Sequence, residues 1–145
     1  MAVTSRIGRD LRPGILDLGL LAAIEWQSEE FARRMSLACV VSSSSREFDL
    51  PQPMATALFS IFRETLTNIA KHANASRVEV SLHEAEQQIE LTVCDNGCGI
   101  EDMDLRKPGS FGLRGMRERA DQLGGSLLIK RGPEGGSVFT VDRKS

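Results

Sequence analysis

Cysteine is scarce in this sequence, and the cysteines that occur do not form a disulfide framework. Cys39, Cys94 and Cys98 make an odd number, and no paired C-x-x-C spacing joins them. A small secreted domain that depends on disulfides has an even set at regular spacings. The first residues also lack an apolar stretch preceded by positive charge, so no secretory signal is visible. These absences lead us to expect a cytoplasmic protein.

An excess of charge of either sign is also missing. With 18 Lys and Arg against 20 Asp and Glu, the net charge of -2 gives no electrostatic footprint for nucleic acid or for an anionic membrane. No apolar run approaches the roughly 20 residues that a membrane-spanning helix needs. The length of 145 residues and the 41% hydrophobic content are typical of one globular domain with a core of its own.

The spacing of apolar residues predicts alternating helices and strands. A period of 3.6 predicts helices over 15–35 and 51–72, and a short helix that carries Leu113 and Met116 and ends at Gly124. Alternation predicts strands, with a long loop over 96–111; the expected strands are 37–41, 47–50, 77–82, 88–95, 126–130 and 137–141. Because each strand is apolar on one face only, we expect an α+β fold. This fold is a two-layer α/β sandwich, with a mixed, mostly antiparallel sheet packed on helices.

A polar stripe lies beside the apolar one on the predicted helix 51–72. Glu64, Asn68, Lys71 and His72 stand at positions i, i+4, i+7 and i+8, so they share one helix face. Together they offer a base, a ligand for a hard cation and two groups that bind anions. On its own, such a stripe is also typical of a solvated helix surface.

A second candidate site is the segment 95–100, which reads Asp-Asn-Gly-Cys-Gly-Ile. Asp95 is in phase with Val93, so its carboxylate is expected to point into the sandwich, where it needs a hydrogen-bond donor. No Arg or Lys of this segment is placed to supply one, whereas an exogenous amine such as the adenine amino group does so. Gly97 and Gly99 let a flat ligand approach the backbone closely. The alternative is a hairpin turn, which the long loop that follows disfavours.

A third candidate is the glycine cluster at 109–116 (GSFGLRGM), where the loop is expected to become a helix. Free backbone N–H groups and the positive end of the helix dipole make such a start a ready phosphate site. The spacing G-x-x-G-x-x-G is neither that of a Walker loop nor that of the dinucleotide motif. Taken alone, this signal is weak.

The three segments together, in this order, resemble the GHKL (Bergerat) ATPase fold, and within it the catalytic domain of two-component sensor histidine kinases. Residues 64–73 (ETLTNIAKHA) resemble the N box of that family, and residues 95–100 (DNGCGI) its D-x-G-x-G box. Residues 109–120 (GSFGLRGMRERA) are similar to the lid glycines and the helix after them. One subgroup typically has the K-H-A and G-M-x-E-R-A sequences. Its dimerisation helices end in the L-R-P…L-D-L-G-L pattern found at 11–20.

The resemblance implies a role for each matching residue, with ATP and Mg²⁺ as cofactors. Asn68 would coordinate the Mg²⁺ that bridges the ATP phosphates, and Glu64 would be the catalytic residue. Lys71 and His72 would contact phosphates, and Asp95 would accept a hydrogen bond from the adenine amino group. The other implied ATP-binding residues are Gly97, Gly99 and Ile100 for the base pocket, Gly109, Gly112 and Leu113 for the lid, and Ser137 for the support of Asp95.

The resemblance also implies a domain organisation and partners. Residues 1–30 would be the C-terminal remnant of a dimerisation helix and its linker, and residues 31–145 the histidine kinase-like ATPase domain. Family members phosphorylate a histidine on the first dimerisation helix. Here the histidines are His72, in the expected nucleotide site, and His83, on a polar strand face. The acceptor would therefore belong to a separate histidine-bearing dimerisation domain, with a response regulator downstream, a homodimer in the full-length protein, and no nucleic acid as partner.

Two other functions of the same fold stay open. One is a nucleotide-gated module that binds a protein partner and has lost its chemistry, which the presence of Glu64 and Asn68 disfavours. The other is a serine kinase that antagonises a sigma factor, which the L-R-P…L-G-L segment disfavours because that family has no dimerisation helix there.

Overall fold

The computed structural model describes residues 18–48, 50–72, 74–85, 88–97, 113–122, 124–131 and 137–144. The helices are α3 (Leu20–Met35), α4 (Gln52–His72) and α6 (Leu113–Gln122). The strands are β1 (Ala38–Ser43), β2 (Arg77–Ala85), β3 (Gln88–Asp95), β4 (Gly125–Arg131) and β5 (Ser137–Lys144). Except for one strand and the start of one helix, the predicted elements are confirmed, with ends shifted by a few residues.

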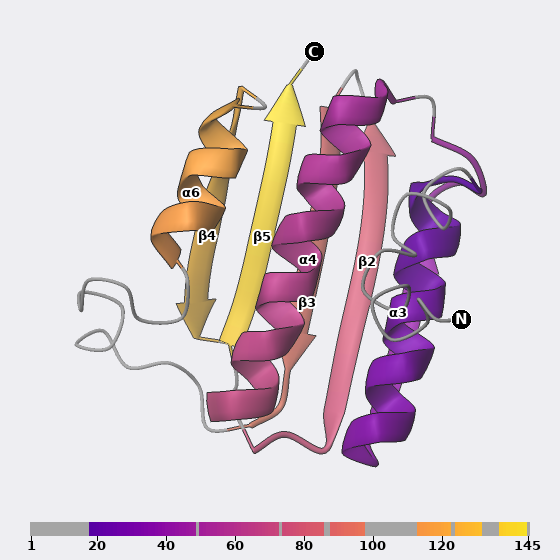
Figure 1. Cartoon of the computed structure of the whole chain (residues 1–145), viewed down its shortest axis with the longest axis vertical. Helices are drawn as coiled ribbons and strands as arrows, with labels where there is room; N and C mark the ends of the chain where they lie inside the picture. Colours follow the sequence, from indigo (N-terminus) through magenta and orange to yellow (C-terminus); the bar gives the residue numbers. More distant parts are fainter. Residues whose placement is uncertain are drawn as a thin grey trace, which may run out of the picture.

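The strands form one mixed sheet in the order β1-β2-β3-β5-β4. β1 runs parallel to β2, and the other neighbouring pairs are antiparallel. α4 lies between β1 and β2 in the chain and makes the crossover that a parallel pair needs. Figure 1 shows α3, α4 and α6 on one face of the sheet, with α4 in the middle. The expected two-layer α+β sandwich is therefore confirmed.

The hydrophobic core lies between α4 and the middle strands. On β2, Val78, Val80 and Leu82 are buried, while the residues between them are more exposed, as the alternation predicts. Leu58 and Phe62 of α4 are fully buried within the same core. Burial of each such side chain contributes roughly 1.5–3 kcal/mol. This packing fixes the rotation of α4 about its own axis, and so determines which of its residues face away from the sheet.

α3 begins later than its apolar pattern predicts. Leu18 and Gly19 are not helical, and the helix starts only at Leu20. Gly19 has a φ of 108°, which glycine adopts readily but which does not occur within an α-helix. The prediction that the helix includes Leu18 and Gly19 is therefore wrong. Ile24 and Phe31 are buried in the common core. The predicted division near residue 30 falls inside α3, and the assignment of residues 1–30 to a dimerisation helix stays a prediction.

One of the predicted strands is absent. The sequence predicts strands at 37–41 and 47–50, but β1 is followed by a turn, and the described residues of 47–50 have no regular structure. Ser43 Oγ donates a hydrogen bond to the Ser45 carbonyl at 2.7 Å, and Ser45 Oγ donates to the Glu47 carbonyl at 2.9 Å. Such local bonds between side chain and backbone compete with a strand ladder, which explains the error.

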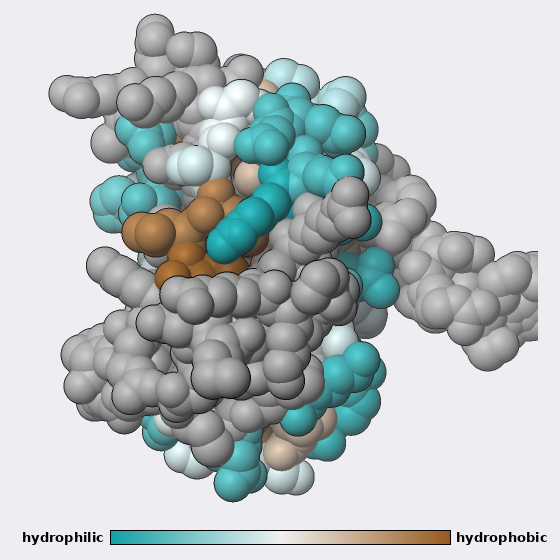
Figure 2. All heavy atoms as spheres, turned by 90° about the vertical axis from the view of Figure 1, so that its left-hand side faces the viewer, coloured by the Kyte–Doolittle hydropathy of each residue, from teal (hydrophilic) through white to brown (hydrophobic). Residues whose placement is uncertain are grey.

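The side of the molecule that carries α6 and β4 is mainly hydrophilic where residues are described. Figure 2 shows one compact apolar patch on this side. Leu128 of β4 is a large hydrophobic side chain that is 54% exposed.

Among the described helices, none combines the length and the apolar character that crossing a membrane requires.

Candidate functional site

Parts of the three predicted motifs lie on neighbouring elements of the sandwich. α4 ends at His72 and β3 ends at Asp95 toward the same end of the sheet, whereas α6 begins at Leu113 beside the middle of α4 (Figure 1). These points are distant in the sequence, so only the fold places them together. The arrangement is the one expected if the three motifs form a single site.

The polar stripe of α4 passes from buried to exposed surroundings. Asn68 is only 3% exposed, and its Nδ2 lies 3.9 Å from the Sδ of Met116, a buried residue of α6. Glu64 is half-buried and Lys71 is exposed. His72 is the last residue of α4, and its side chain lies outside the described part. Because Asn68 is packed against α6, the reading of the stripe as a merely solvated surface does not hold for this residue.

Asp95 ends β3 with its carboxylate inside the sandwich. It is 3% exposed and follows the buried Leu91 and Val93 on the same strand face, as the alternation predicts. Its Oδ1 accepts a hydrogen bond from the backbone N–H of Gly97 at 2.8 Å. A buried carboxylate is costly without such donors, and a bond to a charged acceptor is stronger than a neutral one. This donor was not predicted from the sequence, although the Asp-x-Gly spacing, typical of an Asx turn, is the signal that could have revealed it.

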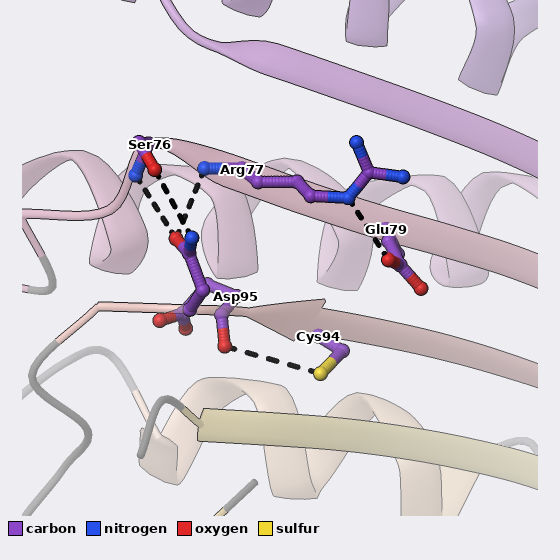
Figure 3. A network of polar contacts seen from close by, with 6 residues as sticks. Ser76, Arg77, Glu79, Cys94 and Asp95 are labelled. Atoms are coloured by element: carbon purple, nitrogen blue, oxygen red, sulfur yellow. Dashed lines mark hydrogen bonds and ion pairs between the residues drawn. The ribbon is translucent and has the colours of Figure 1, made fainter. Parts of the chain in front are cut away.

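Asn96 ties the end of β3 to the start of β2. Its Oδ1 accepts hydrogen bonds from the backbone N–H groups of Ser76 and Arg77, each at 3.0 Å. Its Nδ2 donates to Ser76 Oγ at 3.0 Å, and its own N–H donates to the Arg77 carbonyl at 3.2 Å. Figure 3 shows Ser76 and Arg77 beside Asp95. We therefore assign Asn96 a structural role: it holds the Asp95 turn against the segment that follows α4. No local pattern predicts this role, because the partners lie about 20 residues earlier in the chain.

Several predicted site residues lie wholly or partly outside the described part of the chain. Nothing is described for Gly99, Ile100, Gly109 and Gly112. Leu113 begins α6 and Ser137 begins β5, and only their backbone is described. The ladder between β3 and β5 pairs Cys94 with Val138, so Ser137 begins β5 where β3 ends. The roles implied for these residues stay predictions.

The described residues offer few ligands for a metal ion. Among them, no group of three or more His, Cys, Asp or Glu side chains could hold one. Mg²⁺, however, is commonly bound through one or two protein oxygens together with phosphates and waters. The amide oxygen of Asn68 is a hard ligand of this kind. The residues present therefore fit an ion held mainly by a phosphate-bearing ligand rather than by a cage of protein side chains.

More than half of the chain matches the model of one protein family. Residues 54–144 match the family described as histidine kinase-, DNA gyrase B-, and HSP90-like ATPases. The chain belongs to this ATPase family. The match runs from the start of α4 to the end of β5, so it includes the polar stripe, Asp95 and the glycine cluster.

Curated relatives of this ATPase domain are sensor kinases. The histidine-protein kinase/phosphatase DegS of Brevibacillus brevis is 33% identical over 142 residues, which are 97% of this chain and 36% of the relative. The sensor histidine kinase MctS of Rhizobium johnstonii is 34% identical over 143 residues, which are 97% of this chain and 31% of the relative. The nitrate/nitrite sensor NarX of Escherichia coli is 33% identical over 123 residues, or 85% and 20% of the two chains. The chain thus spans about a third or less of the length of these relatives. It is the ATP-binding catalytic domain of a two-component sensor histidine kinase.

Solved structures show the same fold. The histidine kinase domain of the blue-light activated kinase of Erythrobacter litoralis EL346 has a TM-score of 0.66 at 25% identity, over 86% of this chain and 60% of that one. The catalytic domain of the histidine kinase ThkA has a TM-score of 0.72 at 16% identity, over 86% and 89% of the two chains. The second likeness concerns the fold alone. It shows that this chain and that domain share one fold.

Proposed function

We propose that this ATPase domain binds Mg²⁺ and ATP where α4, β3 and α6 meet, and transfers the γ-phosphoryl group to a histidine of a dimerisation domain. The observation that carries the proposal is the buried carboxylate of Asp95 at the end of β3. An ionised carboxylate accepts hydrogen bonds and donates none, and the amino group of adenine is a matching donor. Guanine carries a carbonyl oxygen at that position, so the site is expected to select adenine.

At the base end, the described residues preorganise Asp95. The N–H of Gly97 holds Oδ1, and the hydrogen bonds of Asn96 hold the turn. The carboxylate is thereby oriented before a nucleotide arrives. Gly97, with Gly99 and Ile100, shapes the pocket around the flat base, and Ser137 supports Asp95.

At the phosphate end, residues of α4 bind the metal ion and the phosphate oxygens. Asn68 supplies an amide oxygen for Mg²⁺, which neutralises phosphate charge when bound. Lys71 and His72 contact phosphate oxygens, and Gly109, Gly112 and Leu113 close over them. Glu64 orients the acceptor imidazole or takes its proton. A bond then forms between a ring nitrogen and the γ-phosphorus, while the bond to the bridging oxygen breaks and ADP leaves. Catalysis of this kind consists mainly of positioning and charge stabilisation.

The partners follow from the reaction. The phosphoryl group passes from ATP to a histidine-bearing dimerisation domain and from there to a response regulator. The full-length kinase is a homodimer, and residues 1–30 are the end of its dimerisation helix. The domain works in the cytoplasm, where ATP is available.

Nucleotide binding is tested first, by calorimetric titration of ADP and a non-hydrolysable ATP analogue with and without Mg²⁺. Asp95→Asn keeps the shape and an oxygen that can accept from Gly97, but it places an amide donor where adenine also donates. Loss of a hydrogen bond to a charged group costs about 1.5–3 kcal/mol, so we expect affinity to fall roughly ten- to a hundredfold. Equal binding by both proteins would overturn the assignment of Asp95.

Phosphoryl transfer is tested separately, with a histidine-bearing dimerisation domain added as a second chain. We expect Glu64→Gln to lose most of the transfer rate while the ATP analogue binds as before, because glutamine keeps the size but cannot take a proton. The outcome that contradicts the kinase proposal is nucleotide binding without transfer by the wild type. In that case a nucleotide-gated binding module becomes the better account.

A further inference from the structure

A groove of about 480 Å³ runs between α3 and α4, with one residue of α6 on its wall. The charged residues among those lining it are mostly cationic: Arg34 of α3, Arg63 and Lys71 of α4, and Arg119 of α6. Glu64 is the single carboxylate among these described lining residues. The groove therefore includes part of the polar stripe of α4 and reaches α3, and Asp95 is not among its described lining residues.

The positive charge of the groove is local. The whole chain has a net charge of -2, so these cations do not reflect a generally basic protein. In the described part of the chain, the ion pairs are Arg33 with Glu30 and Arg77 with Glu79, and neither contains a cation of the groove. Unneutralised charge concentrated along one groove attracts an anionic partner and orients it.

The groove also has an apolar component. Phe31 and Leu66, both lining residues, are almost fully buried, and Met35 at the end of α3 is 38% exposed. A groove between two helices that combines an exposed apolar side chain with charged walls is suited to an amphipathic helix. A free nucleotide or inorganic anion would use the charge but not the contact with Met35.

We propose that this groove binds an acidic amphipathic helix of the histidine-bearing dimerisation domain. Carboxylates of that helix pair with Arg34 and Arg63, and its apolar face lies against the exposed side chain of Met35. Glu64 lines the same groove, so a helix bound there lies beside the residue that acts as the catalytic residue in the proposed function. The inference rests on the proposed function for the identity of the partner, whereas the character of the groove comes from its own residues.

A matched pair of charge reversals tests the proposal. Arg33 and Arg34 are neighbours on α3 and both are exposed, but only Arg34 lines the groove. The dimerisation domain is titrated calorimetrically into the chain, which is saturated with a non-hydrolysable ATP analogue. We expect Arg34→Glu to weaken binding by about tenfold or more and Arg33→Glu by less than about threefold, while Arg34→Lys retains most of the affinity.

Two further readouts separate this proposal from other outcomes. Affinity for the ATP analogue should be the same in all variants, and a parallel loss in Arg34→Glu would show that the groove is part of the nucleotide site. Equal effects at Arg33 and Arg34, or no binding of the domain by the wild type, would also overturn the proposal. If binding follows the expected pattern but no phosphoryl transfer occurs, the result supports the groove as the docking site and contradicts only the proposed kinase function.

Discussion

Replacing Asn96 with alanine removes the side-chain bonds that hold the Asp95 turn to the start of β2. Three bonds are lost, those from the N–H groups of Ser76 and Arg77 and the one to Ser76 Oγ, each 3.0 Å long. The backbone bond from the Asn96 N–H to the Arg77 carbonyl remains. Asn96→Ala therefore tests the side chain alone.

The expected cost follows from the exposure of the partners. A hydrogen bond contributes about 0.5–1.5 kcal/mol net, and the value lies at the lower end where water can replace the lost partner. Ser76 and Arg77 are exposed, so three bonds together are worth about 2 kcal/mol. For a domain of this size, that is a fall in Tm of roughly 5–8 °C. Ser76→Ala removes only the bond to its hydroxyl and should cost about 0.5 kcal/mol.

Urea unfolding followed by far-UV circular dichroism measures both variants under the same conditions. The slope of free energy against urea should match the wild type, so that a shift in midpoint reports stability. The double variant Asn96→Ala/Ser76→Ala should have nearly the same stability as Asn96→Ala, within a few tenths of a kcal/mol. The reason is that the bond removed by Ser76→Ala is already lost in Asn96→Ala. If Asn96→Ala costs no more than Ser76→Ala, the two backbone N–H groups gain nothing from Asn96 and the argument fails.

Three further predictions concern the core, two glycines and a thiol. Leu58→Ala should lower the free energy of unfolding by about 3 kcal/mol in urea titrations, because the side chain is fully buried; a loss below about 1 kcal/mol would contradict the core assignment. Gly124→Ala should destabilise by about 1 kcal/mol because φ is 76°, whereas Gly115→Ala inside α6 should stabilise slightly, provided that Arg119, 3.3 Å from the new Cβ, moves aside. Thermal unfolding compares the two, and shifts of the same sign would refute the backbone argument. Burial raises the pKa of the Cys39 thiol, and the Ser28 hydroxyl offsets only part of this. The contribution of the neutral Cys39 thiol to stability is fully present below the pKa of the unfolded thiol, and it is lost as pH rises through the higher pKa of the folded state. The free energy of unfolding of the wild type should therefore fall more steeply than that of Cys39→Ala between about pH 7 and about pH 10.

Local periodicity determined more of the fold than of the site. The spacing of Leu58 and Phe62 is enough to predict α4, and alternation along β2 and β3 is enough to predict their buried faces. The burial of Asp95 follows from the same alternation, because side-chain direction in a strand reverses at each residue whatever the strand packs against. Where local chemistry opposes a pattern, the prediction fails, as it did at 47–50, where the serines of the turn bond to the backbone.

The order and composition of the motifs determined the family. The N-box-like stripe, the D-x-G-x-G segment and the glycine cluster are each weak signals, but the ATPase family match covers all of them. The sequence alone thus predicted the two-layer fold and the catalytic domain. The backbone N–H donor to Asp95 was missed, because the Asp-x-Gly spacing that marks an Asx turn was interpreted only as a means of close approach for a flat ligand.

Only the tertiary structure decided which distant groups meet. The parallel pairing of β1 with β2, the bonds of Asn96 to Ser76 and Arg77, and the contact of Asn68 with Met116 join residues that are well separated in the chain. The cationic groove likewise needs α3, α4 and α6 side by side. Such contacts depend on strand register and helix packing, which arise from the sum of many burial terms over the whole core. A local window of sequence contains the residues that make these contacts, but not the geometry that selects their partners.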